Sequence, residues 1–191
     1  MIRSASTVRK NNIIADEVNS TTQYCKEAQV GVDLSVKRIW SFENAGIVTK
    51  DKTHVSNYLE VPKTYFDSDG QNHCGWFLIK GNTYICELNE GVQLGKNDTG
   101  MIIMRSSLNR CGVSIESALW DPGFTTCNIE DGKSVIKTMN VRLTVSNPFG
   151  FFLEENSRVA QLVVSDNEDV AALYNGQYQG GEMQSRLVTG K

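Results

Sequence analysis

Arg105, Ser106 and Ser107 follow directly after the apolar run GMIIM, and they form the first candidate site in the sequence. A guanidinium donates charge-assisted hydrogen bonds to phosphate oxygens, and a neighbouring hydroxyl can donate another. If either serine lies near the cap of a short helix, the backbone amides of the first turn also point toward an anion. These residues therefore predict a phosphate cradle with Leu108 packed beneath it, although a solvated strand end would have the same residue types.

Length and composition describe an ordinary folded chain. It has 191 residues, of which 40% are hydrophobic and 21% are charged, as is typical of globular proteins, and we expect a single domain over residues 1–191. Its longest apolar runs fall far short of the roughly 20 residues that a membrane helix needs, and the N-terminus has no hydrophobic signal region. We therefore expect a cytoplasmic protein with no membrane partner.

Charge and cysteine content argue against several kinds of partner and site. The formal net charge is -3 and no basic block occurs, so we expect no nucleic-acid partner, although a few local cations could hold a small anion. The five cysteines are irregularly spaced, which favours reduced structural thiols over disulfides or zinc. Neither His54 nor His73 has the HxE and CxxC neighbours of a zinc-dependent deaminase.

Short runs rich in β-branched and aromatic residues recur between turn signals along most of the chain. They are VGVDLSV, GWFLIKG, NTYICELNE, GMIIMRSS, KSVIKTM, NVRLTVSN and RVAQLVVS. Because long helical periodicity is missing, they predict a mainly β fold, a barrel or jelly roll rather than βαβ units. Helical turns are expected only within residues 4–18 and just after Arg105, and the glycine-rich end, residues 174–191, is expected to be a mobile arm.

Five motifs occur in an order that resembles one enzyme family. They are VGVDLSV (30–36), MRSSLNR (104–110), ALWDPGF (118–124), SRVAQLVV (157–164) and YNGQYQGG (174–181). Together they resemble the trimeric dUTPase and dCTP deaminase superfamily. The resemblance implies a distorted jelly-roll subunit, that is, a dUTPase-like β-barrel of the β-clip type. It also implies a homotrimer with intersubunit active sites and a pyrimidine deoxynucleoside triphosphate as substrate.

The resemblance assigns roles to residues of the third and fourth motifs. Asp121 would contact the deoxyribose 3′-hydroxyl and would orient and deprotonate the attacking water, for which a carboxylate is a suitable base. Phe124 would lie against the sugar and leave little room for a 2′-hydroxyl. Gln161 would contact phosphate or the attacking water, as in the hydrolase version of the fourth motif, whereas Arg158 is expected to be structural.

The phosphates and a metal ion are assigned to the first two motifs. Arg105, Ser106 and, as a second candidate, Ser107 would hold triphosphate oxygens. The resemblance implies Mg²⁺ as cofactor, which would neutralise the triphosphate and position its α-phosphorus for in-line attack. Asp33 would help to hold Mg²⁺ through water, or would order the site structurally.

The tail carries four further candidates for substrate binding. They are Tyr174, Tyr178, Gln179 and Arg186. These side chains would close over the bound nucleotide, with Arg186 reaching the terminal phosphates.

One strand position decides between the two chemistries of the superfamily. Deaminases need a glutamate on the strand after the aspartate motif, which shuttles protons while water attacks C4 of cytosine. Placing Asn147 at the family's strand end puts Thr144 at that position, and a threonine hydroxyl is no base near neutral pH. This placement treats residues 125–139 as an inserted hairpin, whereas an ungapped placement puts Asp131 at the glutamate position.

We therefore expect a Mg²⁺-dependent hydrolase that converts dUTP, or a related pyrimidine deoxynucleotide, to dUMP and pyrophosphate. Two alternatives stay open. Deamination of dCTP requires Asp131 or Glu130 to fold back into the pocket, and the YNGQYQGG tail is closer to the deaminase ending. A non-catalytic nucleotide-binding or regulatory relative would keep the fold without turnover, and the altered motif residues Trp120 and Thr126 motivate that reading.

Overall fold

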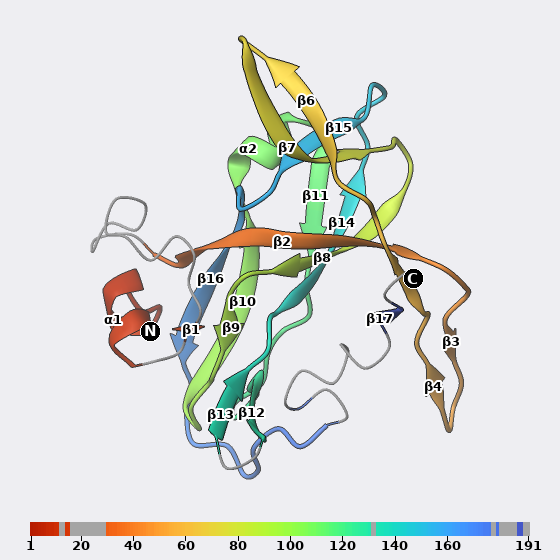
Figure 1. The fold of residues 1–191 in the computed structure, drawn as a ribbon. Coiled ribbons are helices and arrows are strands. Elements are labelled where there is room, and N and C mark those ends of the chain that lie inside the picture. The colour runs from red at the N-terminus through yellow and green to blue at the C-terminus, as the bar shows by residue number, and fades with distance from the viewer. Residues whose placement is uncertain (12–13, 16–29, 131–132, 177–178, 180–186, 189–191) are drawn as a thin grey trace.

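The main element of the fold is a sheet of eight strands (Figure 1), seen in a computed structural model that describes residues 1–11, 14–15, 30–130, 133–176, 179 and 187–188. Six strands follow the order β10-β16-β2-β8-β14-β11, while β5 pairs with β2 and β17 pairs with β5. All of these pairs are antiparallel except β5 with β17. The strands are β2 (Val32–Phe42), β5 (Tyr58–Glu60), β8 (Thr83–Leu88), β10 (Asp98–Met104), β11 (Val113–Glu116), β14 (Asn140–Val145), β16 (Arg158–Asp166) and β17 (Leu187–Val188).

Smaller groups of strands extend from this sheet. One is the three-stranded sheet β15-β7-β6, and the others are the pairs β1-β9, β3-β4 and β12-β13. Figure 1 shows the β6-β7 hairpin near α2 at one end of the molecule and the β12-β13 hairpin at the other. Their bounds are β1 (Ile14–Ala15), β3 (Ile47–Val48), β4 (Thr53–His54), β6 (Thr64–Ser68), β7 (Gln71–Leu78), β9 (Gly91–Val92), β12 (Cys127–Glu130), β13 (Lys133–Ile136) and β15 (Phe151–Glu154).

The main sheet curves until its two edge regions meet. Gly100 in the edge strand β10 forms an antiparallel bridge with Trp120, which lies beyond the end of the opposite edge strand β11. Two backbone hydrogen bonds of 3.0 and 2.9 Å hold this bridge. A Cβ on Gly100 would lie 3.4 Å from the Trp120 ring, so glycine lets the indole pack close to the strand. The result is a mainly β, nearly closed barrel of distorted jelly-roll type, which confirms the predicted fold class.

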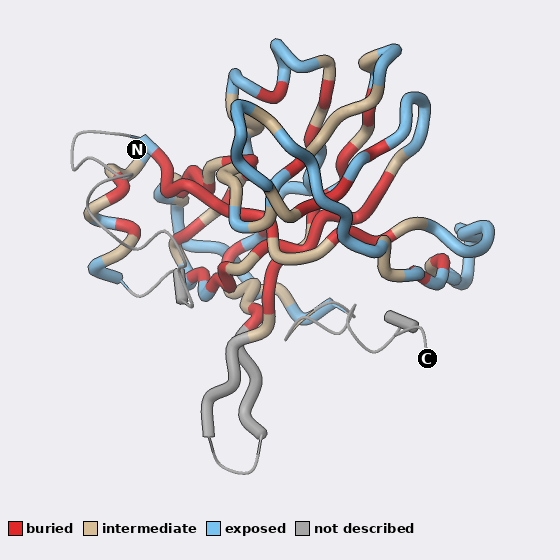
Figure 2. The backbone as a smooth tube through the Cα atoms, turned by 45° about the horizontal axis from the view of Figure 1, so that its top comes forward, coloured by how far each residue is buried: buried red, intermediate tan, exposed pale blue. Residues whose placement is uncertain are grey.

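The hydrophobic core lies along the strands of the main sheet, where Figure 2 shows most of the buried backbone. Along β14, Val141, Leu143 and Val145 are buried, and Arg142 between them is exposed. This alternation follows from the two-residue period of a strand. Burial of each such side chain contributes about 1.5–3 kcal/mol, so the pattern holds β14 in one orientation and keeps its other face available for polar residues.

Both helices lie where the sequence predicts short helical turns. Helix α1 (Ala5–Lys10) begins after Ser4, whose Oγ accepts the N–H of Thr7 at 3.4 Å. Helix α2 (Ser106–Arg110) begins after Arg105, which has an extended backbone and makes no side-chain cap bond. Ser106 is the first residue of this helix, so it lies next to the cap position, where the sequence predicts one of the two serines. All seven predicted strand runs contain or adjoin a strand, whereas β1, β3, β4, β5, β6, β9, β11, β12, β15 and β17 lie outside those runs.

The predicted inserted hairpin over residues 125–139 corresponds to β12 and β13. Asp131 at its turn and the side chain of Glu130 lie outside the described residues, so the prediction that either folds into the pocket stays a prediction. Most of the arm over residues 174–191 also lies outside them. No helix in the described part of the chain is long and apolar enough to span a membrane.

Candidate active site

Asp33 lies at the centre of a cluster that joins three of the motifs. Its side chain is only 5% exposed. Its Oδ1 accepts Nε2 of Gln161 at 2.9 Å, and its Oδ2 accepts Nη1 of Arg158 at 2.9 Å and Nη1 of Arg105 at 3.4 Å. A buried carboxylate is unfavourable unless it is paired and hydrogen-bonded, and these three donors provide that pairing. The geometry favours the ordering role among the two predicted for Asp33.

A β-bulge in β16 brings Arg158 and Gln161 to the same carboxylate. Side chains alternate along a strand, so residues three apart normally point to opposite faces. The register between β2 and β16 shifts between Arg158 and Ala160, which inserts Val159 as an extra residue. Gln161 then pairs directly with Asp33. The bulge therefore places a guanidinium and a carboxamide side by side.

The predicted phosphate cradle lies beside this cluster. The backbone N–H of Arg105 donates to the carbonyl of Val159 at 3.1 Å, which fixes the end of β10 against β16. The Arg105 side chain is 26% exposed, so its guanidinium contacts Asp33 and also reaches solvent. Ser106 and Ser107 are exposed in the first turn of α2, and Leu108 is buried beneath them. The structure thus brings the charged and hydroxyl groups of the cradle together.

Asp121 lies at a pocket of about 410 Å³, a size in the range of small-molecule sites. Its residue is exposed, and no hydrogen bond or ion pair within the described residues engages its carboxylate. The pocket is formed by the loop that carries Asp121, by the start of β14 and the residues before it, and by one residue each of β8 and the tail. The lining residues are Ile85, Glu116, Ser117, Ala118, Leu119, Trp120, Asp121, Phe124, Thr126, Thr138, Met139, Asn140, Val141, Arg142 and Tyr174.

Aromatic side chains form one wall of this pocket. The Phe124 ring lies 5.3 Å from the Trp120 ring and 5.6 Å from the Tyr174 ring, between centroids. The backbone N–H of Tyr174 also donates to the carbonyl of Pro122 at 2.8 Å. Phe124 is therefore packed between Trp120 and Tyr174 and forms a wall of the pocket that a flat ring or a sugar can contact.

The start of the tail packs against the same loop. Gln179 donates from Nε2 to the carbonyl of Gly123 at 2.8 Å, and its Oε1 accepts the N–H of Thr125 at 3.3 Å. Tyr178 and Arg186 lie outside the described residues. Two of the four tail candidates, Tyr174 and Gln179, thus lie beside Asp121 of their own chain.

The Asp33 cluster and the Asp121 pocket lie apart on one chain. Trp120 is bridged to Gly100 in β10. Arg105 lies five residues after Gly100, at the end of the same strand, which corresponds to roughly 16 Å at about 3.3 Å per residue. The lining of the pocket includes none of Asp33, Arg105 and Gln161. The structure therefore does not bring the predicted phosphate ligands to the predicted base.

Thr144, at the position assigned to the deaminase glutamate, does not line the pocket. Its Oγ1 lies 3.2 Å from Oγ1 of Thr83 on the neighbouring strand. A second carboxylate, which the sequence reasoning missed, does line it: Glu116 pairs across β11 and β14 with Arg142, and the two side chains form an ion pair. Only the register of the two strands brings them together.

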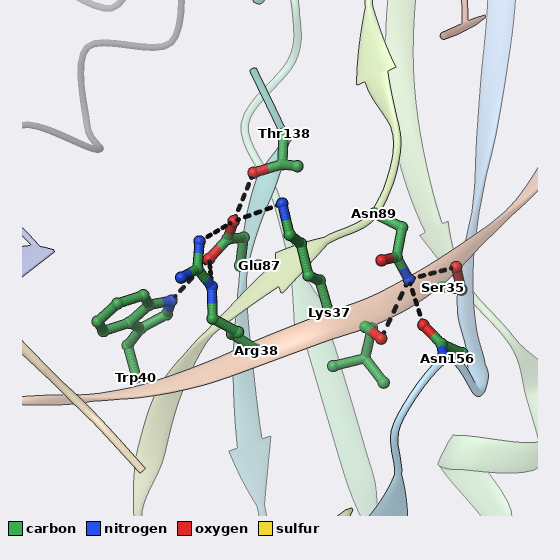
Figure 3. Close-up of polar contacts among 9 residues, drawn as sticks. Ser35, Lys37, Arg38, Trp40, Glu87, Asn89, Thr138 and Asn156 are labelled. Atoms are coloured by element: carbon green, nitrogen blue, oxygen red, sulfur yellow. Dashed lines mark hydrogen bonds and ion pairs between the residues drawn. The ribbon is translucent and has the colours of Figure 1, made fainter. Parts of the chain in front are cut away.

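A buried carboxylate holds the sheet beside the pocket (Figure 3). Glu87 is fully buried and accepts Nε and Nη2 of Arg38 at 2.8 and 3.0 Å, Nε1 of Trp40 at 3.1 Å and Oγ1 of Thr138 at 2.8 Å. Burial raises the pKa of Glu87, but the hydrogen bonds from Arg38 and Thr138, together with the positive charges of Arg38 and Lys37, outweigh it and lower the pKa below its usual value. Because Thr138 lines the pocket, this ionised network helps to fix the pocket wall.

The predicted role of Asp33 in holding Mg²⁺ through water stays a prediction. Its two oxygens accept three hydrogen bonds from cationic or amide donors, and a magnesium-bound water would donate to the acceptor site that is left. No group of three His, Cys, Asp or Glu side chains among the residues described is placed to hold a metal ion.

These features define a β-barrel protein with two separate clusters of predicted site residues, one around Asp33 and one around Asp121. The chain belongs to the dCTP deaminase-like family, whose model matches residues 3–167. The predicted superfamily is thereby confirmed.

Similar proteins are named as hydrolases of deoxyuridine triphosphate. A probable deoxyuridine 5′-triphosphate nucleotidohydrolase of Aeropyrum pernix is 34% identical over 151 residues, which cover 78% of this chain and 82% of that protein. One of Archaeoglobus fulgidus is 27% identical and covers 93% of both chains, and the deoxyuridine 5′-triphosphate nucleotidohydrolase of Methanocaldococcus jannaschii is 29% identical over 80% of this chain and 86% of its own.

A solved structure shares the fold. The crystal structure of 2′-deoxycytidine 5′-triphosphate deaminase from Agrobacterium tumefaciens matches 85% of this chain with a TM-score of 0.56 and 14% identity. This chain spans about half of that one, since 47% of it is covered. At this identity the match supports the barrel architecture alone.

Proposed function

We propose that the protein hydrolyses dUTP, or a closely related pyrimidine deoxynucleoside triphosphate, to the monophosphate and pyrophosphate. The observation that carries the proposal is the exposed Asp121 carboxylate at the rim of an aromatic pocket of about 410 Å³. The names of the similar archaeal proteins support the same activity. Thr144, which bonds to Thr83 instead of lining the pocket, supports hydrolysis over deamination.

The chemistry needs one base and a set of phosphate ligands. Asp121 orients a water molecule toward the α-phosphorus and accepts its proton, while the water oxygen bonds to phosphorus. The bond from the α-phosphorus to the oxygen that bridges to the β-phosphate breaks, and pyrophosphate leaves. Positioned general bases contribute roughly 10²–10⁴ in rate. Arg105, Ser106 and Ser107 bind the phosphate oxygens, and Gln161 contacts a phosphate oxygen or the attacking water.

A second copy of the chain completes the site in this proposal. Arg105 lies roughly 16 Å along the chain from the bridge that anchors the Asp121 loop, and the two clusters do not share a pocket. In a homotrimer, the Asp33 cluster of one subunit faces the Asp121 pocket of the next. Each of the three sites then has its phosphate ligands and its base from different subunits.

Mg²⁺ enters in this proposal as part of the substrate. Among the described side chains there is no cluster of three His, Cys, Asp or Glu that could hold a metal ion, and Asp33 already accepts three hydrogen bonds. A magnesium–triphosphate complex carries its own ligands, the phosphate oxygens and water. The protein then only has to bind the complex.

Separate detection of the two possible products tests the function. Wild-type protein is incubated with dUTP and dCTP in the presence of Mg²⁺, and pyrophosphate and ammonia are followed independently. We expect pyrophosphate from dUTP, no ammonia from dCTP, and loss of turnover in Asp121→Asn, with the exposed Asp51→Asn as matched control. Ammonia release from dCTP would overturn the choice of hydrolysis.

Deamination of dCTP is the second candidate, and one observation favours it. Glu116 is a second carboxylate in the pocket, next to Arg142. Glu116 is engaged by Arg142 in this conformation, and Thr144 has the position assigned to the deaminase glutamate, so hydrolysis is preferred. If ammonia is released, loss of this release in Glu116→Gln would identify Glu116 as the residue that transfers protons. Tight nucleotide binding by calorimetry without any product would instead favour a regulatory relative.

A further inference from the structure

Asn140 carries a buried polar atom that the protein itself does not satisfy. It is the first residue of β14 and lines the same pocket as Asp121. The neighbouring Val141 faces the core, so the Asn140 side chain lies on the other face of the strand, together with Arg142. Its Oδ1 is buried and has no hydrogen-bond partner among the described residues. Buried polar atoms nearly always have a hydrogen-bond partner. The free Oδ1 therefore indicates that a ligand donates a hydrogen bond to it.

The backbone of Asn140 points toward the pocket as well. The carbonyl of Met139 accepts the N–H of Leu88 at 2.8 Å, so Met139 bonds toward β8. Bonding direction alternates along an antiparallel strand, so the N–H and C=O of Asn140 point away from β8, to the side of β11. The ladder between β11 and β14 ends at the pair Glu116 and Arg142. No strand of the described chain therefore covers the edge at Asn140.

Two other polar side chains near Asn140 in the pocket are already engaged. Thr138 donates to Glu87 at 2.8 Å, and Glu116 is ion-paired with Arg142. The remaining surroundings include apolar side chains, among them Met139. In such a setting of low polarity, a hydrogen bond to a ligand is strong and a mismatch is correspondingly unfavourable.

We propose that Asn140 is the residue that selects the base, a role that rests on the proposed function and adds to it. Its Oδ1 accepts the N3–H of uracil, while its backbone N–H, at the uncovered strand edge, donates to a carbonyl oxygen of the ring. Cytosine has a lone pair at N3 in place of the hydrogen, and that lone pair would face the lone pairs of Oδ1. Asn140 therefore favours deoxyuridine over deoxycytidine nucleotides.

A binding cycle between protein and ligand tests this contact. Full-length wild type and Asn140→Leu, which has nearly the same size without polar atoms, are titrated calorimetrically with dUMP and with dCMP, whose N3 has a lone pair in place of the hydrogen. We expect dCMP to bind wild type on the order of tenfold more weakly than dUMP. We expect Asn140→Leu to bind both ligands with similar affinity. Asn72→Leu, an exposed residue of β7, serves as control and should match wild type.

The outcomes separate this inference from the function. Equal losses of affinity from dUMP to dCMP in wild type and in Asn140→Leu, or no loss in wild type, would overturn the role of Asn140 while dUTP hydrolysis stands. Failure of wild type both to bind dUMP and to release pyrophosphate from dUTP would overturn the function and the inference together. If a thermal melt shows Asn140→Leu unfolded, Asn140→Asp, which keeps an acceptor, is used. Its affinity for dUMP should still depend on N3–H, and independence would overturn the proposal.

Discussion

Gln161 and Asp33 lie directly opposite each other on β16 and β2, and Nε2 of Gln161 donates to Oδ1 of Asp33 at 2.9 Å. The other carboxylate oxygen accepts from Arg158 and Arg105. One buried acid therefore fixes the orientation of three side chains that could each contact a phosphate or its attacking water. Asp33 is therefore a positioning residue, and its removal should change the orientation of these three side chains.

Replacement of Asp33 by asparagine should weaken both the fold and the site. The variant keeps the volume but presents an amide to two guanidinium groups, so charge-assisted hydrogen bonds are lost. We expect the free energy of unfolding to fall by about 2 kcal/mol and the KM for dUTP to rise more than kcat changes. Denaturant unfolding and steady-state kinetics measure both, with the exposed Asp67→Asn as control. An unchanged KM would contradict the positioning role.

Mixed oligomers should show whether a site combines two subunits. Arg105→Ala and Asp121→Asn are each expected to be inactive alone, because each removes one half of the site. If Arg105 of one subunit serves Asp121 of another, random 1:1 mixing in a trimer restores about a quarter of the sites. Co-expression with two different tags and tandem purification isolates the mixed species. Purified mixed oligomers without activity would mean that the halves come from one chain.

Phe124→Ala should relax the discrimination against ribonucleotides. The ring is held between Trp120 and Tyr174, so its loss opens space at the pocket wall rather than collapsing it. We expect the ratio of kcat/KM for UTP to that for dUTP to rise by about tenfold, a change that pocket shape can supply. Phe77→Ala, an exposed aromatic on β7, is the matched control. An unchanged ratio would mean that Phe124 only packs in the core and does not discriminate against the 2′-hydroxyl.

Stability should depend on the charge of Glu87. Its pKa in the folded protein lies below the usual 4.5, so its ionised form stabilises the fold fully above about pH 4.5, and this contribution is lost as the pH falls through the lowered pKa. We expect Glu87→Gln to lose about 3 kcal/mol at pH 7, as for a broken buried pair. Thermal melts from pH 7 to 3 should show the difference from wild type shrinking at the acid end. The exposed Glu168→Gln should track wild type throughout.

Local pattern was enough to predict the strands that carry the motifs. The apolar runs at residues 100–104 and 158–164 alternate or cluster as buried strands must, and both are strands in the structure. The short strands between residues 47 and 68 were missed because most of their side chains are exposed. Without a buried face, a strand has no hydrophobic signal in the sequence.

Residue types identified the candidate chemistry, but not its neighbours. The carboxylate of Asp121, the guanidinium of Arg105 and the amide of Gln161 can be named from the sequence because their chemistry belongs to the side chain itself. Arg158 and Gln161 both contact Asp33 only because one extra residue is inserted in β16. Strand register of this kind cannot be read from a short stretch of sequence. Glu116 and Asn140 could be identified as pocket residues only from the structure, because their places depend on the register of β11 and β14.

The sequence by itself determined the mainly β class, the positions of the motif strands and the set of reactive groups, since these follow from local periodicity and side-chain chemistry. Only the tertiary structure decided which of those groups meet. The barrel separates Asp121 from Arg105, places Asp33 under three donors and leaves the strand edge at Asn140 uncovered. Each of these outcomes depends on long-range pairing between strands, whose energy is spread over many contacts that no short stretch of sequence contains.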